Sequence, residues 1–155
     1  MLSADEKIYN ILTTAQQDNT LLEKFHIGYP SRKIAEESNS IFIAAVSSEP
    51  ENELFEATEY RDLVEILVIT KIRDYRGAVT VIKTVIREII RILKQSEDIF
   101  PVTPITRNIS AEYNPDYVLN KGHIFVEALT EIEDNIPDET YEKVCNILVE
   151  NIEVD

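Results

Sequence analysis

The stretch from residue 71 to residue 94, KIRDYRGAVTVIKTVIREIIRILK, constrains the fold most, because its apolar residues repeat at the spacing of an α-helix. They follow the i, i+3, i+4, i+7 pattern although many are β-branched, and Asp74 stands where an N-cap is expected. We therefore predict a helix that packs an isoleucine- and valine-rich face on a β-sheet. The residues of that face are Tyr75, Ala78, Val79, Ile82, Val85, Ile86, Ile89 and Leu93.

The other side of this predicted helix carries a row of cations. Residues 71–94 hold seven of the 15 basic residues of a chain whose formal net charge is −14. The spacing of four and three residues places these side chains on one solvent-facing row. The row is an ordinary solvated helix face, a docking surface for an acidic protein, or a nucleic-acid contact, although the interleaved aromatics and groove-reading motif of the last are missing. Segments 49–53 and 131–155 are candidate acidic complements. Its members, the candidate protein-interaction residues, are Lys83, Arg87, Arg91 and Lys94.

Segments on both sides of the helix have the pattern of β-strands. Residues 41–47, IFIAAVS, form a short apolar run that predicts a buried strand, and we place a turn around Pro50. Residues 54–72 carry apolar side chains on both faces, which is typical of a central strand. Residues 105–113 and 123–132 predict two further strands that pair as antiparallel neighbours.

Helices are also predicted at both ends of the chain. Ser3 and Glu6 have the form of a capping box, so a helix should begin there. A last helix, over about residues 138–152, places Cys145 on its apolar stripe, and we therefore expect this thiol to be buried. The stripe consists of Tyr141, Val144, Cys145, Leu148 and Ile152.

The order of these segments predicts the fold class. Helix, strands, helix, strands and helix follow one another without a break in composition. We predict a single α+β domain over residues 1–155, with an antiparallel or mixed sheet, helices packed on one face, and helices at both termini. The helix over about 138–152 is either part of this domain or an appendage to it.

No pattern in the sequence indicates catalysis or a cofactor. One cysteine and two distant histidines, His26 and His123, do not supply a zinc site. None of the three glycines lies in a phosphate-binding loop, and no GxSxG elbow presents a nucleophile. We expect no enzymatic activity, no cofactor, no metal and no small-molecule substrate.

Charge and hydropathy bear on partners and location. A net charge of −14 disfavours binding to nucleic acids and anionic membranes, since both need a positive field. No apolar run approaches the roughly 18 residues of a membrane span. The start MLSADEKIYN lacks the features of a signal peptide, and a lone cysteine fits a reducing compartment. We expect a cytoplasmic protein without specific nucleic-acid or membrane partners.

The order of elements resembles that of small tail-terminator and head–tail joining proteins of tailed viruses and proviruses. The likeness rests on the N-terminal helix, the turn Gly28-Tyr29-Pro30, the strand IFIAAVS and the arm EYRDLVEILVITKI. It continues with the helix RGAVTVIKTVIREIIRILK, followed by ITRNISAEY and HIFVEALTEI. It covers most of the chain, but not the acidic last helix.

This resemblance implies a non-enzymatic structural role in virion assembly. Proteins of this kind form rings that cap the tail tube, stop its polymerisation and join the tail to the capsid. The implied partners are copies of this chain and other virion proteins. A head-to-tail ring uses two different patches on each subunit, which would give the basic row and the acidic segments a use. The residues alone leave an alternative, a small cytosolic α+β module that binds a protein or ligand and regulates it.

Overall fold

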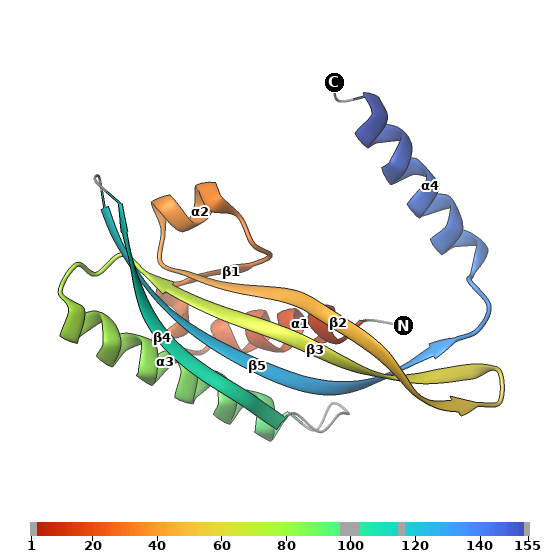
Figure 1. The fold of residues 1–155 in the computed structure, drawn as a ribbon, viewed down its shortest axis with the longest axis horizontal. Helices are drawn as coiled ribbons and strands as arrows, with labels where there is room; N and C mark the ends of the chain where they lie inside the picture. Colours follow the sequence, from red (N-terminus) through yellow and green to blue (C-terminus); the bar gives the residue numbers. More distant parts are fainter. Residues whose placement is uncertain (1–2, 97–102, 115–116, 154–155) are drawn as a thin grey trace.

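A long β-hairpin forms the centre of the protein, which we describe from a computed structural model (Figure 1). The structure describes residues 3–96, 103–114 and 117–153, with the backbone alone over 103–114, 117–119 and 152–153. Strands β2 (Ser40–Leu54) and β3 (Ala57–Thr70) pair antiparallel, and Leu54 lies opposite Ala57. The turn between them consists of Phe55 and Glu56, and Glu56 adopts a left-handed φ of 63°.

Three further strands complete a five-stranded sheet. Strand β5 (Tyr117–Glu133) pairs antiparallel with β3 on one side and with β4 (Thr103–Asn114) on the other. Strand β1 (His26–Gly28) pairs parallel with β2, so the order is β1-β2-β3-β5-β4 and the sheet is mixed. The predicted central position of β3 and the antiparallel pairing of the two late strands are confirmed.

Two long helices pack on one face of this sheet. Helix α1 (Ala4–Gln16) and helix α3 (Tyr75–Gln95) bury their apolar stripes against every second residue of β2, β3 and β5. Each fully buried aliphatic side chain contributes about 1.5–3 kcal/mol, so this layer is the main source of stability. Its largest buried side chains include Ile8, Leu12, Leu22, Ile41, Ile43, Ile66, Ile82, Ile86, Ile89 and Ile124.

Two short elements between α1 and β2 were not predicted from the sequence. A single 3₁₀ turn, η1 (Leu22–Lys24), leads into β1. Helix α2 (Arg32–Glu37) covers one corner of the opposite sheet face, where Ala35 packs with Phe42 and Ile69. The two long helices therefore share one face, as predicted, and only this small helix lies over the other.

The last helix, α4 (Asp138–Glu153), stands away from the rest of the protein. Figure 1 shows it rising from the end of β5 without lying on the sheet, and every residue from 134 to 151 is exposed. The α+β fold with helices at both ends is confirmed. The predicted burial of Cys145 is wrong, because the apolar stripe of α4 contacts no core. The side chain of Ile152 lies outside the described residues.

Some predicted element boundaries are also wrong. The chain does not turn around Pro50, which lies inside β2 opposite Tyr60. A register shift between Pro50 and Asn52 accommodates the proline, which has no N–H to donate to the ladder. Ser3 occupies the predicted N-cap of α1, but its side chain makes no capping hydrogen bond.

Candidate protein-interaction surfaces

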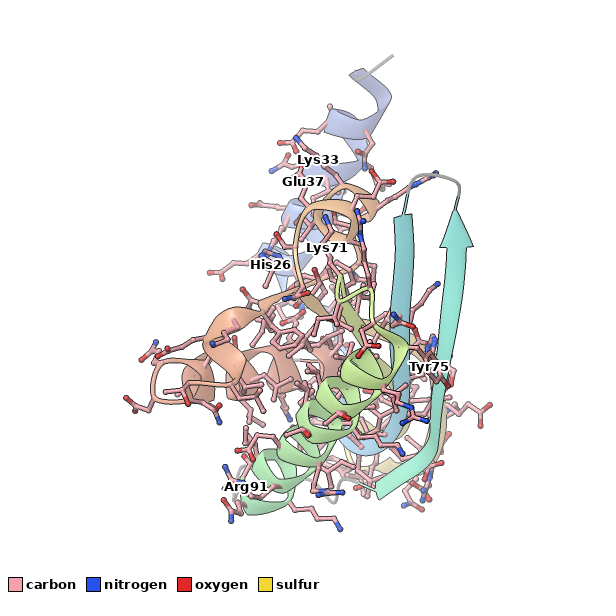
Figure 2. The ribbon with its side chains drawn as sticks, turned by 90° about the vertical axis from the view of Figure 1, so that its left-hand side faces the viewer. His26, Lys33, Glu37, Lys71, Tyr75 and Arg91 are labelled. Carbon is pink, nitrogen blue, oxygen red and sulfur yellow. The ribbon has the colours of Figure 1, made fainter. Side chains whose placement is uncertain are left out.

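The predicted row of cations lies on the outer face of α3. Asp74 fixes the start of this helix, because its carboxylate accepts a hydrogen bond of 2.9 Å from the backbone N–H of Gly77. Tyr75 and Arg91 lie near opposite ends of α3 (Figure 2). The structure brings all four predicted cations to the surface on this one helix. They are Lys83, Arg87, Arg91 and Lys94, and each is exposed.

The row is not uniform, because Arg91 is already engaged within its own helix. Its guanidinium donates hydrogen bonds to both carboxylate oxygens of Glu88, and Nη1 donates to Gln95 Oε1 at 2.8 Å. The hydrogen bond from Arg91 lowers the pKa of Glu88. Within the described part of the chain, no ion pair holds Lys83, Arg87 or Lys94. Of the four cations in this row, these three are therefore the ones that a partner could engage. The i, i+3 spacing of Glu88 and Arg91 was the sequence signal for this difference.

The acidic segments lie at the opposite end of the molecule from most of α3. Residues 49–59 hold five acidic and no basic residues, and residues 131–155 hold nine acidic residues and one basic residue. Figure 1 shows α3 (green) along one half of the sheet, with the β2–β3 turn and α4 (blue) beyond the other half. The two predicted surfaces of opposite charge are thus separated in space.

Part of the acidic charge near the hairpin is neutralised locally. Arg61 on β3 contacts Glu51 of β2 at 2.6 Å and Glu127 of β5 at 2.9 Å. The hydrogen bond with Glu51 is the main cause that raises the pKa of Arg61. This bridge crosses three strands, and it leaves the acids of the hairpin turn and of α4 as the net negative surface.

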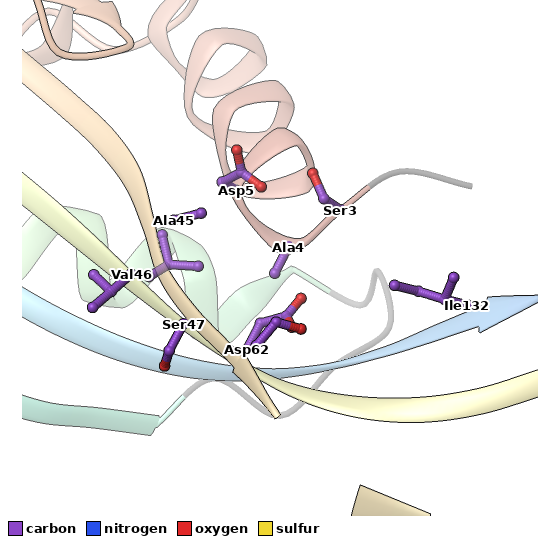
Figure 3. Close-up of a pocket in the computed structure, with 10 residues that line it drawn as sticks. Ser3, Ala4, Asp5, Ala45, Val46, Ser47, Asp62 and Ile132 are labelled. Atoms are coloured by element: carbon purple, nitrogen blue, oxygen red, sulfur yellow. The ribbon is translucent and has the colours of Figure 1, made fainter. Parts of the chain in front are cut away.

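An apolar hollow of about 280 Å³ lies beside the N-terminus of α1, on the helix-covered face of the sheet. Figure 3 shows Val46 and Ile132 at its sides and Asp62 beneath Ala4. Val46 is the extra residue of a β-bulge, since Ala45 pairs with Val64 and Ser47 with Leu63. The bulge leaves the Val46 side chain 51% exposed, so the hollow opens to solvent.

A buried carboxylate forms part of this hollow and was missed by sequence reasoning. Asp62 is only 8% exposed, and it accepts hydrogen bonds from the hydroxyls of Ser48 and Thr130. These donors satisfy a charge that would otherwise be costly to bury. The donors come from β2 and β5, so no local sequence pattern around Asp62 indicates the arrangement.

The residues considered for catalysis or metal binding lie on separate elements. His26 is on β1, Cys145 is on α4, and His123 is on β5, where its Nδ1 lies 3.7 Å from Glu65. Within residues 3–96 and the later described segments, no group of three histidine, cysteine or acidic side chains is placed to hold a metal ion. Among the described helices, none has both the length and the apolar character of a membrane span.

No protein-family model matches the sequence, and no curated protein shows significant similarity to it.

Proposed function

We propose that this protein is a non-enzymatic structural subunit of a tailed virus or provirus, of the tail-terminator or head–tail joining kind. In this proposal, copies of the chain assemble in the cytoplasm into a ring that caps the tail tube and joins it to the capsid. The partners are other copies of the chain and other virion proteins. The proposal requires no cofactor, membrane or specific nucleic-acid contact.

The spatial separation of charge is the observation that carries this proposal. The exposed cations Lys83, Arg87 and Lys94, which make no ion pair with the described residues, face outward from α3. The acidic hairpin turn and α4 lie beyond the other half of the sheet (Figure 1). A ring built head to tail uses two different surfaces on each subunit, and opposite charges favour their contact. A two-fold dimer that paired either surface with itself would bring like charges together.

The apolar hollow supports one alternative function. A hollow of about 280 Å³ beside the buried Asp62 is a feature that a small regulatory binding module would use for a peptide or ligand. The two functions differ in oligomeric state. A ring subunit should form species of several copies, whereas a regulatory module need not.

Light scattering after size-exclusion chromatography tests the proposal directly. The mass of the untagged protein should be measured over a range of concentrations at about 50 mM and about 300 mM salt. We expect a ring-sized species whose population falls with salt, because the distance over which exposed charges interact shrinks from roughly 14 Å at 50 mM to roughly 6 Å at 300 mM. A monomer under every condition would contradict the ring.

Charge reversal on α3 tests the role of the basic row. Arg87→Glu should weaken assembly at low salt, and Arg91→Glu should weaken it less, because Arg91 is engaged by Glu88. Lys33→Glu is the matched control, since Lys33 is an exposed cation on α2, away from α3 (Figure 2). Equal masses for Arg87→Glu and the wild type at both salt concentrations would exclude this electrostatic contact.

A further inference from the structure

The exposed apolar residues of the described chain are concentrated at one end. Of the 12 large apolar side chains that are exposed, only Tyr29 and Tyr75 lie elsewhere. Five are on α4, between Tyr141 and Val149, and the other five are Val46, Leu54, Phe55, Ile132 and Ile136. Exposed apolar residues gathered in this way on a soluble protein mark an interaction surface.

Helix α4 cannot be explained as an isolated structure. It has 16 residues, and helices of this length are marginally stable in water unless an apolar face is packed. Its apolar stripe includes Val144 and Leu148, which are 50% and 58% exposed. The acids Glu139, Glu142 and Glu150 project from the opposite side of the helix. The described part of the chain therefore leaves this stripe uncovered.

Two α4 helices packed on each other would not be enough. A helix of 16 residues is about 24 Å long and about 10 Å wide, so its packed face has a projected area of about 240 Å². The accessible surface that this face buries is larger than the projection but still smaller than that of a standard interface. Stable interfaces bury roughly 800 Å² on each partner. The stripe must therefore join a larger apolar surface. The hollow offers one, because Ile132 lines it and the exposed Ile136 lies four residues further along the chain, in the connection to α4.

We propose that α4 of one copy lies across the apolar hollow of a second copy, with Val144 and Leu148 against Val46 and Ile132. This inference rests on the proposed self-assembly and adds an apolar contact to the charged one proposed above. Each chain then carries one protruding helix, α4, which we call the α4 arm, and one apolar hollow, which we call the socket. Two different surfaces of this kind on each subunit are what a head-to-tail ring uses. The β-bulge at Val46 opens the hollow to solvent, so its apolar lining is accessible to a second copy.

The connection that precedes α4 is hydrogen-bonded to the hairpin turn and not to the hollow of the same chain. The backbone N–H of Asp134 donates to the carbonyl of Glu56 at 3.0 Å, and Thr58 Oγ1 donates to Asp134 Oδ1 at 3.0 Å. These bonds attach the connection to the hairpin turn, and Pro137 stiffens the last step into α4. The short connection of residues 134–137 therefore directs α4 outward, as Figure 1 shows. An arm held in this way reaches a neighbour more readily than the hollow beside its own strand.

The single cysteine provides a direct test, because Cys145 is exposed and belongs to the stripe of α4. A socket chain is made with Val46→Cys and Cys145→Ser, so that its only thiol lies at the hollow. It is mixed with the wild type and oxidised mildly, and the products are analysed by non-reducing electrophoresis and peptide mass spectrometry. We expect a disulfide-linked dimer that joins position 46 of one chain to Cys145 of the other.

Two controls make the crosslink interpretable. The matched control places the thiol on α3, as Thr80→Cys with Cys145→Ser, and it should crosslink at least tenfold less. The single variant Val46→Cys, which retains Cys145, distinguishes the two sources of the helix. A monomer-sized product with both thiols joined would show that α4 folds onto its own hollow, and it would overturn the proposal. Crosslinking no greater than that of the α3 control would overturn it as well.

A second pair of variants separates this inference from the proposed function. Leu148→Asp places a charge in the stripe and should weaken self-association tenfold or more, whereas Asn146→Asp adds the same charge on the polar side and should change it less than twofold. Rings that persist in Leu148→Asp would overturn the α4 contact and leave the ring function standing. Crosslinked dimers without any ring-sized species would support the α4 contact and contradict the ring.

Discussion

The hydroxyl of Thr130 on β5 donates a hydrogen bond of 2.7 Å to Asp62 Oδ2, on the neighbouring strand β3. Ser48 of β2 donates to the other carboxylate oxygen, Oδ1. A single carboxylate therefore links three adjacent strands at the place where the helices end and the hollow begins. Because Asp62 is 92% buried, its charge depends on these two donors for the solvation that water would otherwise give.

Removing one donor tests this arrangement. Thr130→Val preserves the shape of the side chain but leaves Asp62 Oδ2 without its buried partner. We expect a loss of about 1–3 kcal/mol in the free energy of unfolding, because an unsatisfied buried acceptor bears its full desolvation penalty. Urea denaturation, followed by circular dichroism, measures this change.

Thr58→Val is the matched control for this prediction. Thr58 also donates from its hydroxyl to an aspartate, Asp134, at 3.0 Å, but that pair is exposed to solvent. Water replaces the lost bond there, so the expected loss is about 0.5 kcal/mol or less. Equal losses in the two variants would show that burial of Asp62 does not determine the effect.

The sequence predicted α3 well because its signals are local. The apolar residues repeat at helical spacing over five turns, and Asp74 caps the helix through a bond to Gly77, three residues away. Such features depend on near neighbours in the chain, and tertiary packing then only confirms them. The exposed position of the cations follows from the same periodicity.

The β2–β3 hairpin shows where sequence reasoning fails. The polar run around Pro50 has the composition of a loop, yet it pairs with residues 57–62 in a ribbon that extends beyond the helices. Residues 45–54 of β2 are exposed on both faces, so no alternation of apolar residues marks this run as a strand. The sequence also does not indicate that Asp62 is buried, because its burial depends on the bulge at Val46 and on the register of β3 with β5.

Helix α4 was predicted as an element, but its environment was not. An amphipathic pattern predicts that a helix has an apolar side, whereas the structure decides which surface covers that side. The prediction that Cys145 is buried assumed cover from the same chain. The exposed stripe in this structure is consistent with cover that comes from another copy.

Asn39 links β1 to the end of β3 and offers a second test of stability. Its backbone carbonyl accepts a bond of 2.8 Å from His26 N, and its side-chain Oδ1 accepts a bond of 2.8 Å from Lys71 N. Asn39→Ala removes the side-chain acceptor, and we expect a loss of about 0.5–1.5 kcal/mol in the free energy of unfolding. Thermal unfolding monitored by calorimetry gives the measurement.

Asn39→Asp separates acceptor chemistry from side-chain packing. The carboxylate keeps an oxygen for the Lys71 N–H, and a charged acceptor strengthens such a bond. This variant should therefore be more stable than Asn39→Ala at neutral pH. If the two variants were equally destabilised, the bonds that Asn39 Oδ1 accepts from Lys71 N and from the Thr70 hydroxyl would not be what Asn39 contributes.

The Glu88–Arg91 pair on α3 predicts a pH dependence with a definite sign. The hydrogen bond from Arg91 lowers the pKa of Glu88 in the folded protein. A carboxyl of this kind contributes stability that is fully present above its unfolded pKa, about 4.3, and that is lost as the pH falls through the lower folded pKa. Glu88→Gln should therefore be less stable than the wild type at pH 7, by up to about 1 kcal/mol because the pair lies at the surface. The two proteins should converge in urea denaturation as the pH falls from 5 toward 3, and in an Arg91→Met background the difference should be small throughout. A stability difference that grew as the pH fell would contradict the assigned role of Arg91.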